Sequence, residues 1–421
     1  MAKNIFLFIS LTLLSGLNAF ALDLHGFVEG AAGVRVADKG KTKHDEYNML
    51  ETRFQLKTRY YPEKFLSDKD SEIYFRGDFL LDGYYGAKTA FELRDLYLTF
   101  SPFDFMDIKA GRQVFTWGTG DLLFINDLFP KDYISFLTGR DDEYLKASSD
   151  GVKFSVYNEI ADVDIVAIPF FEPNVTAKGD RVSMFDSFQQ GIAGRKSDRD
   201  LLEPPHQASN AEYAVRVYKT ISSYEAAGYF FHGFYKNPLG YKSEADRQLF
   251  YPRLDVYGAS LRGPFASGIF STEAGYYNSR EDSDGNNRLI QNSSFKIMAG
   301  YEKDMGNDLR LGFQYMYDRI LDYSEYLNAL MPWDYYWDKD RQTLTLRLTK
   351  MNKAQTLIYS MFVFYSPDDE DAYLRPSVTW KRSDKLSFVL GADLFWGEGD
   401  ITDWGMFQEN KNIYLRVRYS F

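Results

Sequence analysis

The chain has no cysteine, little proline and only four histidines among its 421 residues. The absence of cysteine excludes disulfide bridges, thiolate metal sites and a lipid-modified N-terminal cysteine. The histidines, His25, His44, His206 and His232, lie on widely separated segments, and no Gly-x-Ser-x-Gly, HExxH or P-loop motif occurs. These absences argue against the common hydrolases and metalloenzymes, so we expect no catalytic residue, no metal and no cofactor.

Long apolar runs are also missing beyond the first residues. The apolar stretch from Ile5 to Leu14 follows Lys3 and leads to Ala19-Phe20-Ala21, which is typical of a secretory signal peptide. This stretch is shorter than the ~20 residues of a membrane-spanning helix. No later run approaches that length, so insertion into a membrane would have to use a β-barrel. We therefore predict a cleaved segment, 1–21, followed by a single domain, 22–421.

Aromatic residues make up 17% of the chain, and many of them lie in segments where apolar and polar residues alternate. In residues 48–60, Leu50 and Phe54 alternate with Arg53 and Lys57. A strand that separates lipid from a polar lumen has this period of two. A charged face also suits the solvent side of a soluble sheet, but its repetition along the chain favours a barrel.

Segments with this period predict an all-β, transmembrane antiparallel barrel of about eighteen strands, with sixteen as the alternative. The predicted strands are 23–36, 48–61, 71–84, 91–100, 105–115, 151–158, 161–170, 212–221, 224–232, 254–262, 267–277, 294–303, 308–318, 341–351, 355–365, 372–380, 386–395 and 411–421. Short connections such as 158–161 and 304–307 alternate with long ones such as 116–150 and 171–211. In outer-membrane barrels, short periplasmic turns alternate with long external loops in the same way, which supports the count of eighteen strands. The connection 62–70 departs from it, because it is longer than a tight turn.

The chain ends in an alternating strand, Asn412 to Phe421, whose last residue is phenylalanine. This ending resembles the C-terminal strand of outer-membrane β-barrels, which the barrel-insertion machinery recognises. The stretch Gly111 to Gly118, GRQVFTWG, and the loop Ile125 to Asp132 that follows it are similar to a pattern in porin-like and exopolysaccharide-export outer-membrane proteins. The resemblance implies a porin-like protein of the bacterial outer membrane and names no solute.

A strand directly after residue 21 leaves no room for an N-terminal plug domain, so we expect the barrel to enclose an aqueous lumen. Passive diffusion of small hydrophilic solutes is then the expected function. The alternatives are a conduit that exports an anionic polysaccharide and a structural or adhesive barrel with a blocked pore. The expected partners are outer-membrane lipids, lipopolysaccharide, the insertion machinery and the solutes. Nucleic acid is not expected, and the chain can be monomeric or form a homo-oligomer.

Residues 116–150 are the predicted constriction of the pore. Apolar residues of this connection, among them Leu122, Phe124 and Phe129, are costly to leave in water, so we expect the loop to fold into the lumen. The alternative is packing over the barrel rim or against a neighbouring protomer. The candidate constriction residues are Arg112, Trp117, Asp121, Asp127, Lys131 and Asp132. Arg112 falls in phase with lipid-facing residues, which indicates a bulge or a place at the rim.

Lumen-facing positions of the predicted strands carry more Arg and Lys than Asp and Glu, although the net charge is -11. Charges of one sign set the ion preference of a pore, so this excess predicts modest anion selectivity. The candidate selectivity residues on the wall are Arg53, Arg76, Arg310, Arg347, Arg375 and Arg416. An equally good interpretation is that these arginines pair with luminal acids. The acidic clusters 141–143 and 368–371 could bind Ca²⁺ or bridge to lipopolysaccharide, but solvated external loops explain them better.

Overall fold

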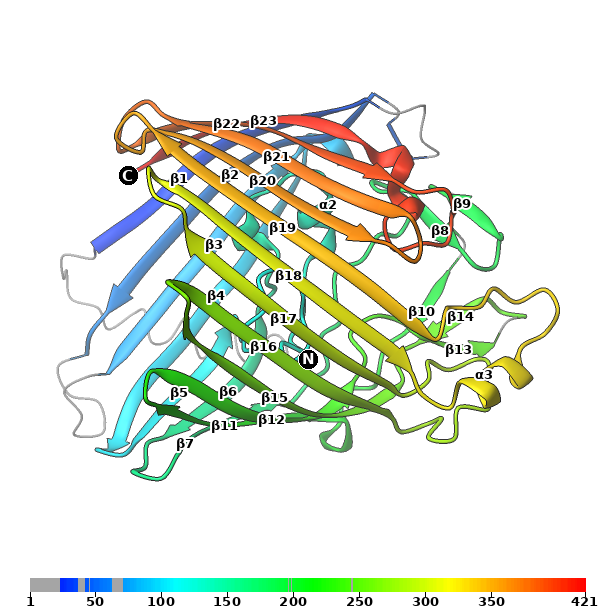
Figure 1. The fold of residues 1–421 in the computed structure, drawn as a ribbon. Coiled ribbons are helices and arrows are strands. Elements are labelled where there is room, and N and C mark those ends of the chain that lie inside the picture. The colour runs from blue at the N-terminus through cyan, green and yellow to red at the C-terminus, as the bar shows by residue number, and fades with distance from the viewer. Residues whose placement is uncertain are drawn as a thin grey trace.

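The computed structural model describes residues 23–36, 42–44, 46–62, 71–195, 197, 199–243 and 245–421. Eighteen of its strands form one antiparallel sheet, which closes into a barrel because β1 pairs with both β2 and β23 (Figure 1). The barrel strands are β1 (Asp23–Arg35), β2 (Tyr47–Tyr60), β3 (Glu72–Asp82), β4 (Lys88–Phe103), β5 (Met106–Gln113), β6 (Ser149–Val156), β7 (Asp162–Ile168), β11 (Glu212–Ile221), β12 (Tyr224–Phe234), β15 (Arg253–Phe265), β16 (Gly268–Ser279), β17 (Ser294–Asp304), β18 (Leu309–Ile320), β19 (Asp340–Asn352), β20 (Leu357–Ser366), β21 (Asp371–Lys381), β22 (Leu386–Trp396) and β23 (Asn412–Ser420).

The smaller elements all lie in connections between barrel strands. They are η1 (Gly83–Tyr85), α2 (Tyr133–Thr138), η2 (Asp142–Tyr144), β8 (Met184–Asp186), β9 (Gly191–Ala193), β10 (Asp200–Leu202), η3 (Ala208–Asn210), β13 (Gly240–Ser243), β14 (Gln248–Phe250), α3 (Tyr323–Ala329) and η4 (Gly405–Asn410). In Figure 1 the C-terminus and short turns lie at the left, whereas α3, η4, β8 and β9 lie at the right. None of the helices in the described part of the chain has the length and apolar character needed to cross a bilayer.

The predicted barrel and its count of eighteen strands are confirmed, because each predicted segment overlaps one barrel strand. The predicted alternation of faces also holds in β2, where Leu50 and Phe54 are exposed on the outside while Arg53 is buried. The predicted signal segment 1–21 lies outside the described residues, and so does 63–70 within the long connection after β2. The fold could be derived because period and turn spacing agree along most of the chain.

Closure of the sheet satisfies the backbone groups of the first and last strands. The N–H of Gly26 donates to the carbonyl of Phe421 at 3.1 Å, and the N–H of Phe421 donates back to Gly26 at 3.0 Å. On the outer surface the ring of Phe421 stacks on Phe54, with centroids 5.9 Å apart. A bilayer offers no hydrogen-bond partners to an open sheet edge, so this seam is a condition for insertion.

The strand β20 has apolar residues on both faces, which its sequence period could not resolve. Phe362 and Phe364 are buried on the inner face, where Phe364 packs on Phe136 of α2 at 6.0 Å and on Trp404 at 4.7 Å between ring centroids. These inward apolar residues have partners because loops fold back inside the barrel. The lumen therefore contains a hydrophobic core of its own.

We predict that Gly26→Ala weakens the closed barrel. An added Cβ on Gly26 would lie 2.0 Å from the carbonyl oxygen of Gln55, so β1 must move away from β2 at the seam. The folded fraction after refolding, measured by heat-modifiable migration on gels, should fall. Gly30→Ala on the same strand is the matched control, because an added Cβ there meets nothing within 4 Å. Equal folding of the two variants would contradict the prediction.

Candidate functional site

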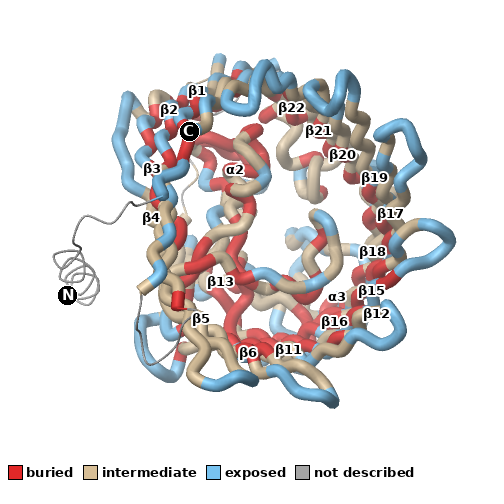
Figure 2. Tube along the Cα trace, turned by 90° about the vertical axis from the view of Figure 1, so that its left-hand side faces the viewer, coloured by how far each residue is buried: buried red, intermediate tan, exposed pale blue. Residues whose placement is uncertain are grey.

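The connection between β5 and β6, residues 114–148 and here called the β5–β6 loop, contains α2. Seen along the barrel, α2 lies inside the ring of strands (Figure 2). Asp132 caps the start of α2 by accepting the N–H of Ser135 at 2.9 Å, and Gly139 ends the helix in a left-handed conformation with φ 82°. Phe136 and Leu137 of this short helix are buried in the inner core.

The first half of the β5–β6 loop is bonded to the wall formed by β16, β18 and β19. The carboxylate of Glu273 accepts N–H groups from Thr119, from Gly120 at 2.7 Å and from Asn126 at 3.2 Å. The side chain of Asp121 forms an ion pair with Arg347 on β19. A single buried carboxylate on β16 therefore fixes the path of the loop over several residues.

The second half of the loop is bonded to the wall formed by β21, β23 and β3. Asp141 pairs with Arg416 at 2.8 Å and with Arg418 at 3.2 Å, and Asp142 pairs with Arg375 at 2.9 Å. Burial opposes ionisation of Asp141, but Arg416 and Arg418 outweigh it and hold its pKa below the usual value. The loop thus contacts separate parts of the wall through charged groups.

The acidic cluster 141–143 serves as the partner of wall arginines. Its third member, Glu143, lies 3.4 Å from Arg418 and 3.7 Å from Arg76. Burial and the neighbouring Asp141 raise the pKa of Glu143. Among the described residues no group of three or more acidic or histidine side chains is placed to hold a metal ion.

All the arginines predicted to set selectivity lie beside carboxylates. The pairs are Arg53 with Asp78 and Glu92, Arg76 with Asp95 and Glu143, Arg310 with Glu302, Arg347 with Asp121, Arg375 with Asp142 and Asp393, and Arg416 with Asp141 and Glu29. This arrangement matches the alternative interpretation, in which the luminal charges neutralise one another. Arg310 is set apart from the others, since it pairs with Glu302 at the end of the barrel that has the short turns.

Two luminal lysines differ from these arginines. Within the described part of the chain, neither Lys57 nor Lys109 takes part in an ion pair with a carboxylate. The ammonium group of Lys109 lies 3.7 Å from the ring centroid of Tyr97, and Tyr97 in turn packs on Tyr74 at 5.2 Å. Both lysines lie in the half of the lumen near the short turns, where β2 ends and β5 begins.

Arg112 is the last residue but one of β5, and it bonds to the next loop rather than facing lipid. Its guanidinium donates to Glu172 at 2.9 and 3.2 Å and also lies 3.2 Å from Asp150. Gly111 has φ 129°, a conformation that L side chains rarely adopt, yet the pairing of β5 with β6 runs unbroken through Arg112, which stays in phase with Ala110. The place at the strand end, one of the two predicted explanations, is the one observed.

The other candidate residues of the loop divide between its interior and its edge. Asp127 and Lys131 pair with each other at 2.9 Å with side chains only 3% exposed, so they hold the loop together. Trp117 packs on Phe129 at 5.2 Å and Tyr229 at 6.2 Å. Of the charged candidates in the loop, Asp121 therefore combines exposure with a position against the wall.

Some residues that anchor the inner loops were missed by sequence reasoning. Arg94 lies at a bulge in β4 and donates to the carbonyls of Glu143 at 2.9 Å and Lys146 at 3.0 Å. The consecutive charges Arg94-Asp95 break the alternation, and that break was a usable signal for a bulge. Arg140 and Arg181 had no such signal, because loops carry no period.

Comparisons with known proteins extend only to structure. No family model matches the chain, and no curated protein matches it in sequence. Crystal structures of similar fold include Pseudomonas aeruginosa OccK11 (OpdR), with 8% identity and TM-score 0.53, covering 94% of this chain and 95% of that one. Acinetobacter baumannii OccAB3 has 10% identity and TM-score 0.53, covering 95% of this chain and 99% of that one. OccAB4 of the same organism has 10% identity and TM-score 0.54, covering 94% of this chain and 97% of that one. What they share is the fold.

Four aspartates lie near one another at the outer end of the barrel, three of them in connections and one, Asp371, at the start of β21. Asp369, in the turn between β20 and β21, faces Asp371, Asp403 and Asp338, with Arg341 as the neighbouring cation. Burial and these carboxylates raise the pKa of Asp369 to about 6. Asp371 accepts the N–H of Trp404 at 2.6 Å, so this region contacts the β22–β23 connection, residues 397–411, and we expect the contact to depend on pH.

We predict that the β22–β23 connection opens less readily at about pH 5 than at about pH 7.5. A carboxyl group with a raised pKa binds its proton more tightly in the folded arrangement. Asp369 therefore favours the closed contact below its unperturbed pKa near 3.8, and this contribution is lost as the pH rises through about 6. Hydrogen exchange of 397–411, corrected for intrinsic rates, should be slower at the lower pH. Asp369→Asn should remove this difference between the two pH values. Exchange of 397–411 that is the same at both pH values in the wild type would refute the assigned role of Asp369.

Proposed function

We propose that the chain is a bacterial outer-membrane channel through which small hydrophilic solutes diffuse, with a modest preference for anions. The observation that carries this proposal is a closed barrel of eighteen strands whose inner wall is lined by ionised side chains. Apolar side chains cover the outside, among them Phe79, Leu390 and Leu415. A polar inside and an apolar outside suit a water-filled passage through lipid.

The β5–β6 loop is the proposed constriction, because it is bonded to different parts of the wall and any passage must run beside it. Exposure separates the residues that border this passage from those that hold the loop. Asp121 and Arg347 keep 40% and 29% of their side-chain surface and form a pair facing the open space. Asp142 is also exposed, whereas Arg53, Arg416 and Lys131 are buried and have structural roles.

The anion preference is proposed from the cations that lack a carboxylate partner. Lys57 and Lys109 lie on the same stretch of wall, which β2 to β5 form. Lys153 is close by on β6 and is only loosely paired, with Asp164 at 3.7 Å. A net positive potential on one side of a narrow aqueous passage enriches anions there.

Loosening the β5–β6 loop should widen the channel. Glu273→Ala removes the acceptor of the Thr119, Gly120 and Asn126 N–H groups, so residues 118–126 lose their fixed path. We predict a larger single-channel conductance in planar bilayers, or larger current fluctuations. Glu281→Ala, an exposed position just beyond the same strand, is the control and should conduct like the wild type. A wild-type conductance for Glu273→Ala would contradict the constriction.

The reversal potential across a KCl gradient tests the charge assignment. We predict that the wild type favours chloride and that Lys109→Glu weakens or inverts this preference, because the variant replaces an uncompensated cation by an anion. Lys109→Arg keeps the charge and should retain the preference. Cation selectivity of the wild type would refute the proposed role of the luminal lysines.

A barrel with a blocked pore is the second candidate, and one observation favours it. The hydrophobic cluster inside the barrel joins Ile125 and Phe129 of one inner loop to Val182 and Met184 of another. Such a core narrows the lumen, which also argues against a conduit wide enough for a polysaccharide chain. Absence of conductance from a correctly folded wild type would favour the blocked barrel.

A further inference from the structure

The connection between β7 and β11, residues 169–211 and here called the β7–β11 loop, contributes Val182 and Met184 to the inner hydrophobic core. Part of it is deeply buried, with Arg181, Val182, Ser183 and Met184 all 5% exposed or less. This segment leaves the wall at β7 and reaches the region of β1 to β3. It therefore crosses part of the outer end of the barrel.

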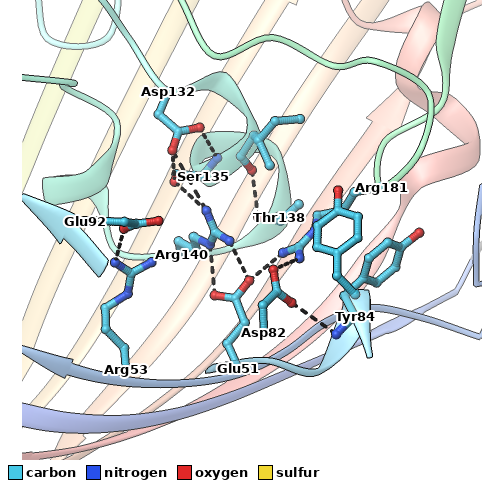
Figure 3. Close-up of polar contacts among 12 residues, drawn as sticks. Glu51, Arg53, Asp82, Tyr84, Glu92, Asp132, Ser135, Thr138, Arg140 and Arg181 are labelled. Carbon is cyan, nitrogen blue, oxygen red and sulfur yellow. Dashed lines mark hydrogen bonds and ion pairs between the residues drawn. The ribbon is translucent and has the colours of Figure 1, made fainter. Parts of the chain in front are cut away.

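The side chain of Arg181 occupies a charged pocket on that wall (Figure 3). Its guanidinium forms ion pairs with Glu51 of β2 and Asp82 of β3. It also lies over the rings of Tyr84 at 4.7 Å and Tyr85 at 5.0 Å. Two carboxylates and two aromatic faces around one guanidinium are a specific receptor for arginine.

The backbone beside Arg181 is held as well. The hydroxyl of Tyr84 donates to the carbonyl of Asp180 at 2.6 Å, so the pocket binds the main chain and the side chain together. At Ser183, the backbone N–H donates to the side-chain oxygen of Asn410 at 2.9 Å, and the side-chain amide of Asn410 donates back to the carbonyl of Ser183 at 2.8 Å. Residues 180–183 are thus docked on groups from separate external connections.

Glu51 binds both inner loops at once. Besides Arg181, it accepts from Arg140 at the end of α2, with Nε 3.0 Å from Oε2. Glu51, Asp82, Arg140 and Arg181, here called the Glu51 cluster, contain two carboxylates and two guanidinium groups, so their charges balance. In Figure 3 both arginines point toward the same carboxylate.

The two loops also share backbone hydrogen bonds away from the Glu51 cluster. The N–H of Tyr133 donates to the carbonyl of Val175 at 2.9 Å, and the N–H of Val175 donates to Lys131 at 2.9 Å. This pairing fixes the start of the β7–β11 loop on the β5–β6 loop. The part beyond it, 176–195, is held by the Glu51 cluster and the docked residues 180–183, by Met184 in the inner core and by the hydroxyl of Tyr241, which donates to Ser187 at 2.6 Å.

We propose that residues 176–195 are a second closure of the channel, at its outer end, and that Glu51 holds this closure and the α2 segment together. This inference rests on the proposed channel function. Arg181 is a positioning residue in it, since it acts by fixing the loop. When Arg181 leaves its pocket, 176–195 moves away from β1 to β3 and the outer entrance widens.

The members of the Glu51 cluster should differ in effect. Arg181→Ala leaves the Glu51–Arg140 pair intact, so it should release only the outer closure. Glu51→Gln leaves Arg181 with Asp82 alone and Arg140 with only Asp132, 3.9 Å away, and a buried charge that loses its close partner is strongly unfavourable. That variant should release both loops. Arg181→Lys keeps the charge but lacks the planar guanidinium that reaches Glu51 and Asp82 through separate nitrogens and lies over Tyr84, so its effect should be intermediate.

The chain's lack of cysteine allows a direct measurement of docking. Ser183→Cys places a thiol where the side chain is buried, and its reaction with a polar maleimide should be slow. Adding Arg181→Ala or Glu51→Gln should speed this reaction about tenfold or more. Arg199→Ala is the matched control, because Arg199 bonds to Asp186 and Phe185 within the same loop. Heat-modifiable migration establishes that each variant is folded.

Single-channel conductance, measured on the same variants without the added thiol, tests whether the docked segment limits the passage. We expect conductance to rise in Arg181→Ala and to rise further in Glu51→Gln, with Arg199→Ala unchanged. Faster labelling with unaltered conductance in a conducting channel would overturn the closure. Unaltered labelling would overturn the role of Arg181. Absence of current from every folded variant, the wild type included, would instead remove the channel function on which the inference rests.

Discussion

Hydrogen bonding between the first and last strands is the constraint on which the rest of the structure depends. Only a closed sheet leaves no unpaired backbone groups toward lipid, and the exchange between Gly26 and Phe421 is part of that closure. Once the sheet is closed, alternate side chains must face inward. The outward-facing side chains can be apolar because they contact lipid. The inward-facing side chains need polar or apolar contacts inside a lumen that the strands alone do not fill.

The inner loops solve that second problem with charge and with apolar packing. The β5–β6 loop contributes carboxylates and the wall contributes guanidinium groups, as in the pairs of Asp141 with Arg416 and Asp142 with Arg375. Apolar residues of α2 meet inward phenylalanines of β20 in the same region. Paired charges in a wet lumen add little stability each, so their main effect is to fix where the loops run. The shape of the passage then follows from a few specific pairs.

Most of the fold could be predicted from the sequence, because barrel strands obey a period of two and turn lengths alternate between the two ends. The candidate site could be predicted only in part. The loop and its arginine partners followed from composition, but the pairing of Asp127 with Lys131 and the bond from Arg112 to Glu172 depend on tertiary packing. Arg181 belongs to a loop without period, so nothing local connects it to Glu51.

The ion pairs around Asp141 have a consequence for assembly of the barrel. Asp141 contacts Arg416 and Arg418 on the last strand, and Arg418 also pairs with Glu29 on the first strand at 2.8 Å. These groups are neighbours only after the two terminal strands have met. The inner loop can therefore reach its final place only as a late step, after the seam forms. Its docking would mark a finished barrel and distinguish it from one still open at the side.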